Sequence, residues 1–461
     1  MVLDTTLLSR IQFAFTVSFH ILFPAFSIGL SIFLAIMEGI WLKTKDPNYR
    51  SICKFWTKIF ALTFGMGVVS GIVMGFQFGT NWSGFTRSVG GVLGALFTYE
   101  VMTAFFIEAG FLGVMLFGWE KVGPRLHFLA TLLVTIGTTL SAYWILAANS
   151  WMQHPVGFKE VGGIFRVTSW YDVILSNPMV WPRFLHMLVA AYIVASFVVV
   201  SVTGYYILKN KFTQFAKISF AFSWIVLLIL TPLQIFLGDM NGVLDHKYQP
   251  MKTAAMEAVW ETQKGAPFLI FAIPDQKAQK NLWEIGVPGG AAFINTHSWS
   301  GELVGLKSVS RSEQPNVFTV FFTFRIMVYV GFLMLLLALI ALYLRIKHKL
   351  YDSKWFLRAS VASAPLGFIA LWCGWVTAEV GRQPWVVYGL VKTGDASSKV
   401  PLHDVIVSFV LIFIVYGVIF GYFYFYFLHK MISKGPTDIE AKPLDQPFQY
   451  MSSSTAEEPK P

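Results

Sequence analysis

Two side chains that can bind iron lie within long apolar stretches of the sequence. His186 occurs in RFLHML and Met327 occurs in FRIMVYVGF. The distribution of basic residues, described below, places both at the outer ends of predicted membrane helices, the fifth and the seventh. An imidazole and a thioether at one depth suit the two axial positions of a low-spin haem, and this ligation raises the reduction potential. Each residue alone also has an ordinary interpretation, as a hydrogen-bonded membrane histidine or as a methionine that fills the core.

Arg325 lies two residues before Met327 in the same apolar stretch. Ionisable residues inside membrane helices are costly and usually mark function. The guanidinium could neutralise a haem propionate, or its long stem could carry it to the membrane interface. The sequence leaves both interpretations open.

Glu379 lies one helical turn after Trp375 in the segment CGWVTAEVGRQPW. The segment continues with Arg382, Gln383, Pro384 and Trp385. A helix stop with a tryptophan in the interfacial belt explains the residues that follow, but it does not explain the carboxylate. A carboxylate can coordinate a haem iron and offset its positive charge. His20, deeper in the first predicted helix, could hold another iron.

Glu100 and Glu108 lie within VLGALFTYEVMTAFFIEAGF, which should form the third membrane helix. On an ideal helix they are about 80° apart, so both can face one interior channel. An ionised carboxylate is strongly penalised in lipid, and proton carriage is therefore the better reason for keeping two. We expect Ser141, on the next predicted helix, to lie near Glu100. The alternative is a pair of glutamates that bond to backbone or line a transport cavity.

The composition indicates a membrane protein that can position these side chains. Hydrophobic residues make up 55% of the chain and charged residues only 13%, whereas soluble domains carry about a quarter charged residues. A spanning helix needs about 20 mostly apolar residues. The segments that meet this test are 13–41, 56–79, 93–118, 126–149, 184–208, 217–238, 317–344, 358–380 and 404–428. The predicted fold is an all-α integral membrane protein with a bundle of about nine transmembrane helices.

The basic residues set the predicted orientation of this bundle. They concentrate in the first, fifth and seventh connections, at Lys43, Lys45, Arg50, Lys54, Lys58, Lys209, Lys211, Lys217, Arg345, Lys347, Lys349, Lys354 and Arg358. Positive residues stay cytoplasmic, so the N-terminus should be outside and the C-terminus cytoplasmic. The net charge of +10 therefore reflects basic residues that set the membrane orientation, and it does not indicate nucleic-acid binding. Only Cys53 and Cys373 are present, which excludes a disulfide framework or a CxxC metal site.

The predicted organisation has four parts. Residues 1–238 hold helices one to six, residues 239–316 form a long outer loop, residues 317–428 hold helices seven to nine, and residues 429–461 form a disordered cytoplasmic tail. Within the loop, PMKTAAMEAVWETQ predicts a short helix that begins at Pro250. We expect Glu257 and Glu261, four residues apart, to share one face of it; on the residues alone, a surface helix with ordinary charges is the simplest interpretation.

The set of motifs resembles the first, haem-bearing subunit of the cytochrome bd family of quinol oxidases. The matching pieces are SRIQFAFTVSFHILFP, GFQFGTNW, RFLHM, FRIM and GWVTAEVGRQPW, which occur in the family's order along the whole chain. No single piece is specific, but the combination is. The loop lacks the late insertion that some members carry, which is typical of the short-loop branch.

The resemblance implies a low-spin haem b held by His186 and Met327, with Arg325 beside it. It implies that Glu379 and His20 serve two high-spin haems, one a haem b and the other a haem d or a second haem b. In the outer loop it points to Lys252 and Glu257 as quinol-binding residues. The motifs do not assign the two high-spin haems to their ligands.

The resemblance also implies partners and a reaction. Quinol would be oxidised at the outer face and dioxygen reduced to water, with protons arriving from the cytoplasm past Glu108 and Glu100, which generates a proton motive force without a pump. A second integral membrane subunit is implied, and a small accessory subunit and bound lipid are compatible with it. Ala109 stands where some members carry serine, so the proton path must use another polar group.

Two other functions fit part of the pattern. A proton-coupled secondary transporter could use Glu100 and Glu108 as coupling carboxylates, but it gives no reason for an outer His/Met pair, and the sequence shows no inverted repeat. A haem-b electron-transfer subunit would need two doubly ligated haems and no open iron site.

Overall fold

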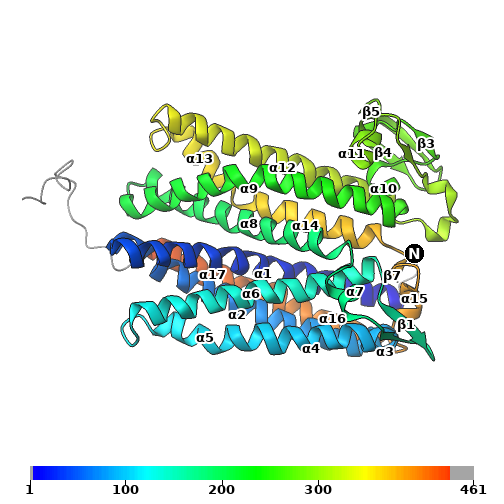
Figure 1. Ribbon diagram of the computed structural model, residues 1–461, viewed down its shortest axis with the longest axis horizontal. Helices are drawn as coiled ribbons and strands as arrows, with labels where there is room; N and C mark the ends of the chain where they lie inside the picture. Colours follow the sequence, from blue (N-terminus) through cyan, green and yellow to red (C-terminus); the bar gives the residue numbers. More distant parts are fainter. Residues whose placement is uncertain (1–3, 437–461) are drawn as a thin grey trace, which may run out of the picture.

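The computed structural model describes residues 4–436 as a bundle of long helices with small hairpins at one end (Figure 1). Within these residues, nine helices are long and apolar enough to span a membrane, as the sequence predicted. Six are uninterrupted: α1 (Thr5–Thr44), α2 (Pro47–Thr80), α6 (Pro124–Gln153), α8 (Val180–Leu208), α9 (Thr213–Tyr248) and α12 (Val317–Ile346).

The other three spans are interrupted. The third consists of α3 (Ser83–Val89), α4 (Ala95–Glu100) and α5 (Phe106–Phe117), joined by π-helical turns at Gly90–Gly94 and Val101–Phe105. The eighth consists of α13 (Lys354–Ala362) and α14 (Ala364–Gly381), and the ninth of α16 (Leu402–Ile412) and α17 (Gly421–Lys434), joined by the π-helical segment Phe413–Phe420. Helical backbone in these spans pairs most peptide groups within the span, as the bilayer requires.

Local sequence sets where several of these helices begin. The Asp4 side chain accepts a hydrogen bond from the Leu7 amide at the start of α1, and Asn316 accepts one from Thr319 at the start of α12. Asp46 caps α2, with Pro47 in the first helical position. Short polar side chains satisfy the free amides of a first helical turn, and proline has none to satisfy.

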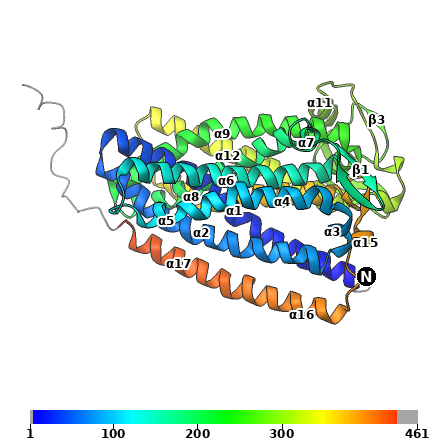
Figure 2. The same cartoon turned by 60° about the horizontal axis from the view of Figure 1, so that its bottom comes forward.

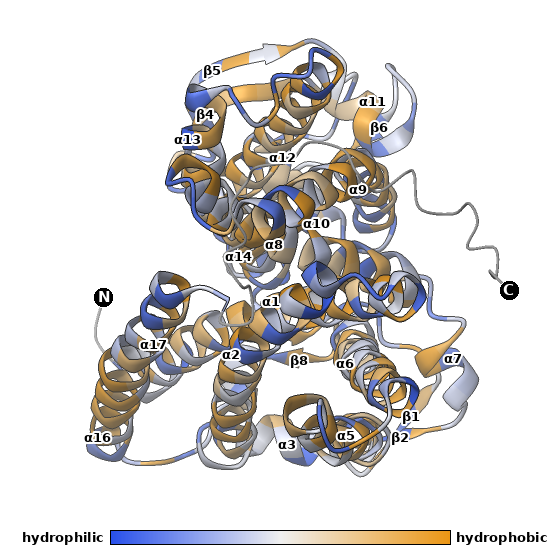
Figure 3. Ribbon diagram, turned by 90° about the vertical axis from the view of Figure 1, so that its left-hand side faces the viewer, coloured by the Kyte–Doolittle hydropathy of each residue, from blue (hydrophilic) through white to orange (hydrophobic). Residues whose placement is uncertain are grey.

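α1 occupies the centre of the bundle, between α2, α6 and α8 (Figures 2 and 3). The approach to α8 is so close that a Cβ added at Gly29 would lie 2.1 Å from the Ala191 carbonyl oxygen. Small residues allow such contact between membrane helices. The tight packing fixes the depth of α1 and α8 relative to each other, and with it the depths of His20 and His186.

The helices run farther than the hydropathy predicted, and two predicted boundaries are wrong. α9 continues to Tyr248, so the outer loop begins at residue 249 and not at 239. Residues 239–248 are mostly polar, which ends the apolar signal without ending the helix. Likewise α17 continues to Lys434, so residues 429–434 are helical. The rest of the predicted tail, 437–461, lies outside the described residues.

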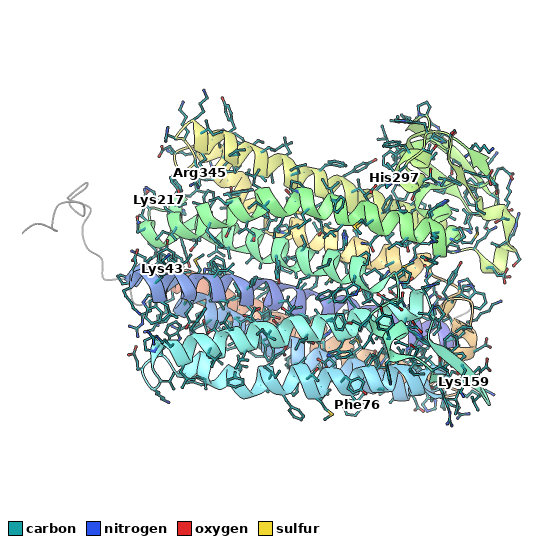
Figure 4. The ribbon with its side chains drawn as sticks, viewed as in Figure 1. Lys43, Phe76, Lys159, Lys217, His297 and Arg345 are labelled. Carbon is teal, nitrogen blue, oxygen red and sulfur yellow. The ribbon has the colours of Figure 1, made fainter. Side chains whose placement is uncertain are left out.

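The connections at the loop-bearing end of the bundle fold into short elements. They include α10 (Pro250–Glu257), α11 (Gly290–Thr296) and the antiparallel pairs β1 (Phe158–Val161) with β2 (Ile164–Val167) and β4 (Phe268–Asp275) with β5 (Lys280–Val287). Lys159 and His297 lie at this end, whereas Lys43, Lys217 and Arg345 lie at the other (Figure 4). The predicted sidedness makes the first end periplasmic.

This orientation can be tested with single introduced cysteines, because both native cysteines are buried. In spheroplasts, a membrane-impermeant maleimide should label Ala278→Cys, in the β4–β5 turn, but not Lys349→Cys, in the connection after α12. Both positions are exposed on the protein surface, so only the side of the membrane on which each lies decides whether the reagent reaches it. After detergent permeabilisation both should react. Labelling of Lys349→Cys alone in intact spheroplasts would reverse the predicted topology.

Candidate functional site

Glu379 lies at the outer end of α14 in a buried polar cluster. Its carboxylate pairs with Arg382 on the next helical turn. The Asn149 amide, from the last turns of α6, donates a hydrogen bond of 3.0 Å to Glu379 Oε1. Arg183, near the start of α8, donates to the side-chain oxygen Oδ1 of Asn149. Three helix ends therefore hold this carboxylate between two guanidinium groups.

Lys252 joins the outer loop to the same cluster. It lies in α10, is 1% exposed, and its Nζ donates to Gln153 Oε1 at 2.7 Å and lies 3.3 Å from Asp245. The Gln153 amide nitrogen is 3.3 Å from Glu379 Oε1. Burial lowers the pKa of Lys252 to about 8, and the charge of Asp245 opposes this decrease. One glutamine thus connects the predicted quinol residue to the predicted haem ligand.

Glu257, the last residue of α10, forms a buried ion pair with Arg325 of α12. Glu257 Oε2 lies 2.7 Å from Arg325 Nη2, and the two side chains are 0% and 2% exposed. Arg325 Nε also donates to the Leu269 carbonyl at 2.6 Å. The interpretation of α10 as an ordinary surface helix is therefore wrong, because its residues Met251–Glu257 are buried. Both interpretations of Arg325, beside a haem propionate or at the membrane interface, stay predictions.

The predicted pairing of Glu257 with Glu261 on one helical face is also wrong. α10 ends at Glu257 because Ala258 takes a left-handed conformation with φ 52°. Glu261 lies beyond the helix, is exposed, and pairs with Lys307. Of the two acidic residues, only Glu257 enters the interior.

His186 and Met327 are both partly buried within the bundle, on α8 and α12. Glycines from neighbouring helices lie against both: a Cβ at Gly238 would lie 3.5 Å from the His186 ring, and one at Gly374 would lie 2.8 Å from Met327 Sδ. His186 Nε2 is 3.2 Å from the Gln234 amide, and its Nδ1 is buried without a hydrogen-bond partner among residues 4–436. Their joint ligand role stays a prediction.

His20 lies in α1 against α2, where its Nδ1 is 3.0 Å from the Ser70 hydroxyl. Gly71 leaves room for the ring, since a Cβ there would lie 3.1 Å from it. α1 also packs against α14, the helix of Glu379. The two predicted high-spin ligands thus lie on adjacent helices.

The remaining residues predicted around Glu379 are spread more widely. Trp375 packs partly buried against the main apolar core. Gln383 lies just beyond α14, where its side-chain oxygen accepts a 2.6 Å hydrogen bond from Thr393. Trp385 lies under the Lys392 ammonium, 5.0 Å from the ring centroid. These contacts are local, and Arg382 alone of the residues following Glu379 contacts its carboxylate.

Glu100 and Glu108 both lie against α6. Ser141 donates a 2.8 Å hydrogen bond to Glu100, which confirms the predicted proximity. Glu108 is 5% exposed and packs so close to Gly137 that an added Cβ would lie 2.6 Å from its Cγ. Gly137 and Ser141 are one turn apart, so the two carboxyl groups follow the same face of α6 despite the π-helical turn between them.

A second buried acid–base pair was missed at the opposite end of α6. His127 Nδ1 lies 2.6 Å from Glu38 Oε1, and Thr131 donates a 2.6 Å hydrogen bond to Glu38 Oε2. His127 Nε2 faces the Met115 carbonyl at 3.1 Å, so Nε2 must donate. A histidine at the end of an apolar segment gives no sign of burial, but Glu38, inside the first predicted span 13–41, was a signal that could have revealed the pair.

Buried donors without partners lie near the predicted ligands. Within residues 4–436 they are Arg183 Nε, Arg325 Nη1 and Arg382 Nε and Nη1. Buried polar groups are normally paired, so these donors fit anionic groups such as haem propionates. Together with the glycines beside His186 and Met327, they make the residues present compatible with bound haem.

Comparison with known proteins identifies the family. Residues 8–436 match cytochrome bd terminal oxidase subunit I. This chain belongs to that family. As subunit I of a cytochrome bd oxidase, it is a multi-pass protein of the bacterial membrane that carries haem and works with a second subunit.

Relatives of this cytochrome bd subunit cover almost its whole length. Cytochrome bd ubiquinol oxidase subunit 1 of Bacillus subtilis is 38% identical over 420 residues, 89% of this chain and 90% of the relative. Cytochrome bd-II ubiquinol oxidase subunit 1 of Escherichia coli is 32% identical, over 90% and 93%. The solved bd oxidase from Geobacillus thermodenitrificans has a TM-score of 0.88 at 27% identity, covering 94% of this chain and 99% of that one.

The buried pair of Arg325 and Glu257 gives a stability prediction for this subunit. Glu257→Leu should destabilise the protein by about 3–5 kcal/mol, because it leaves an unpaired guanidinium in the interior. Thermal unfolding of the purified oxidase and proteolysis of its outer segment would measure the effect. Glu261→Leu, at an exposed acid in the same segment, is the matched control and should change neither. Equal effects of the two substitutions would refute the assigned importance of the buried pair.

Proposed function

We propose that this chain oxidises membrane quinol beside α10 at the outer face and delivers the electrons inward for the reduction of dioxygen to water. The observation that supports this best is the buried connection from Lys252 through Gln153 to Glu379. It links the segment resembling a quinol site to a candidate iron ligand by two side-chain contacts. The named relatives are ubiquinol oxidases, which agrees with this substrate class.

His186 and Met327 would hold a low-spin haem b, and His20 and Glu379 would serve two high-spin haems, one of them a haem d or a second haem b. When bound, haems supply the one-electron chemistry and the open iron at which oxygen reacts. The guanidinium nitrogens of Arg183, Arg325 and Arg382 that have no partner among residues 4–436 would bind propionates. The assignment agrees with two partly buried histidines, each with one ring nitrogen beside a hydroxyl or an amide.

At the quinol end, Lys252 and Glu257 would bind and orient the quinol hydroxyls. Lys252 already donates to Gln153, and Glu257 already accepts from Arg325. A quinol hydroxyl near Glu257 would replace part of this bonding and give its proton toward the outer face as the electrons leave. Before the quinol binds, each of the two charges is balanced, because Glu257 is paired with Arg325 and Lys252 with Asp245.

The proton supply would follow α6 from the cytoplasmic end. Polar groups occur along it in order: His127 and Thr131 with Glu38, then Glu108 against Gly137, then Glu100 with Ser141. Ala109 offers no hydroxyl, and the threonines of α6 are the available substitutes for it. These groups would move protons inward while electrons arrive from outside. Each charge separated across 100 mV stores about 2.3 kcal/mol, so no pump is needed.

The proposed reaction also sets the partners. This subunit would line one side of the proton path. The second integral membrane subunit would cover the exposed face formed by α2 and the third span. A small accessory subunit and ordered lipid would complete the assembly. Quinol and dioxygen would both enter from the membrane phase.

A reduced-minus-oxidised visible spectrum tests the haem assignment. Met327→Leu should remove the low-spin haem b signal selectively, because leucine cannot ligate iron. Met334→Leu, two turns inward on α12 and also buried, is the control and should leave the spectrum unchanged. Carbon monoxide should still shift the high-spin signals in both variants. An unaltered low-spin band in Met327→Leu would exclude this residue as the ligand.

Oxygen consumption tests the proton path. Glu108→Gln keeps the shape of the side chain but cannot carry a proton, so turnover should fall by about a hundredfold, the scale of a positioned proton carrier. Haem content should not change. Glu120→Gln is the matched control, since Glu120 is an exposed cytoplasmic-end glutamate paired with Arg50. Full activity of Glu108→Gln would remove this residue from the path.

A further inference from the structure

The β4–β5 hairpin carries a large apolar surface that no other described residue covers. Seven side chains make up this hairpin surface, which extends over both faces of the hairpin because neighbours along a strand point to opposite sides: Ile270, Phe271, Ile273, Leu282, Trp283, Ile285 and Val287, which are 36% to 66% exposed. Soluble surfaces rarely collect so many large apolar groups on two adjacent strands. β4 and β5 form a two-stranded sheet, so within residues 4–436 neither strand has a second strand neighbour.

Charge is separated from this surface along the hairpin. Asp275, Lys277 and Lys280 lie at or beside the turn that joins the strands, and Glu284 is the one charged side chain in the remainder of the two strands. The hairpin is therefore polar at its tip and apolar along its body. Such a division is typical of elements that lie at a membrane interface with their polar part in water.

The hairpin body continues the lipid-facing side of α12. The ring of Phe271 lies 6.3 Å from that of Phe322, and Phe322 lies 4.7 Å from Phe318. The hydroxyl of Tyr329, two turns further along α12, donates to the Ile270 carbonyl. Phe318 and Tyr329 are themselves 54% and 42% exposed. The apolar surface of strand and helix is thus continuous.

The depth of this contact can be counted along α12. Arg345 and Lys347 mark its far end. A hydrocarbon layer of about 30 Å takes about 20 residues at about 1.5 Å each, which reaches from Leu344 to Phe324. Tyr329 lies five residues inside that limit, so the Ile270 carbonyl that it contacts lies close to the boundary between acyl chains and headgroups.

We propose that the hairpin surface is seated in the outer leaflet of the bilayer beside α12. β5 lies at the periphery of the molecule, outside α12 when the bundle is viewed end-on (Figure 3), which places it over lipid and away from the helices around α1. Trp283 and Tyr329 supply the aromatic groups that favour the headgroup region. The continuity with a membrane-facing helix favours lipid over a protein partner.

The consequence for substrate rests on the proposed function. The base of the hairpin contacts Arg325 through the Leu269 carbonyl, and Arg325 holds Glu257. A hairpin held in the leaflet would therefore keep α10 within reach of a quinol whose prenyl tail stays in lipid. The hairpin surface would act in the entry of long-tailed quinol, without contacting the reacting hydroxyls.

Fluorescent labelling of the complete oxidase in nanodiscs tests the seating. Both native cysteines are buried, so Ile285→Cys and, at the hairpin tip, Lys277→Cys can each carry a single environment-sensitive label. The label's emission is measured in lipid that carries a nitroxide near the headgroup and again in plain lipid. The ratio of the two emissions is the readout, because quenching by haem is the same in both and cancels. Val287→Cys provides a second position if Ile285→Cys does not assemble.

The label at residue 285 should lose about half its emission in nitroxide lipid and resist aqueous iodide, as expected for shallow insertion. The label at residue 277 should show the reverse. Quenching of residue 285 by iodide alone would overturn the proposal in favour of a solvent-exposed surface. Protection from both quenchers would overturn it in favour of a covering protein, either the second subunit or another copy of this chain.

A kinetic measurement separates the seating from the quinol role. Trp283→Ser should raise the KM for a long-tailed quinol about fivefold, while the KM for a short-tailed analogue and the kcat stay unchanged, because only access from lipid is altered. Equal KM changes for both quinols would refute the entry role. If the unmodified oxidase turned over neither quinol, the proposed function would fail while the lipid-quenching result stood independently.

Discussion

The buried ion pair between Arg325 and Glu257 constrains the outer half of this protein more than any other contact. Neither charge reaches water, and an unpaired charge in such a place costs several kcal/mol. The chain must therefore bring together residues that are 68 positions apart. That requirement holds α10 against α12, and Lys252, five residues before Glu257, is held with it against the end of α6. One pairing thus positions a whole loop segment over the membrane helices.

The bilayer explains why the polar residues gather where helices end. Backbone in the hydrocarbon must be helical, and charged side chains there are penalised, so a polar cluster can form at low cost only near the interface. Gln153 closes α6, Arg183 opens α8, and Glu379 with Arg382 closes α14. Three helices therefore bring their polar ends to one level, and the arginine donors there that have no partner among residues 4–436 indicate that an anionic group belongs among them.

The sequence predicted the helices well and their ends poorly, for one physical reason. Twenty apolar residues give a strong signal, whereas a helix that leaves the membrane, as α9 does up to Tyr248, keeps its backbone bonds but loses its hydropathy. The contact of Ser141 with Glu100, on the preceding membrane helix, was predicted and is confirmed. The contact of Glu257 with Arg325 could not be predicted, because a long loop with no periodicity separates the two residues. For the pair of Glu38 and His127 half of the signal was present, since Glu38 lies inside an apolar segment whereas a helix-end histidine gives no sign of burial.

The length of α6 connects the two chemistries that the proposed function requires. Thr131 bonds Glu38 near one end and Gln153 contacts both Lys252 and Glu379 at the other. Twenty-two residues separate them, or about 33 Å of helix, which is close to the thickness of the hydrocarbon layer. Glu108 and Glu100 pack against the same helix in between. In the proposed function, a helix of this length would keep proton uptake and quinol oxidation on opposite faces, and charge separation would then follow from fixed geometry without a conformational cycle.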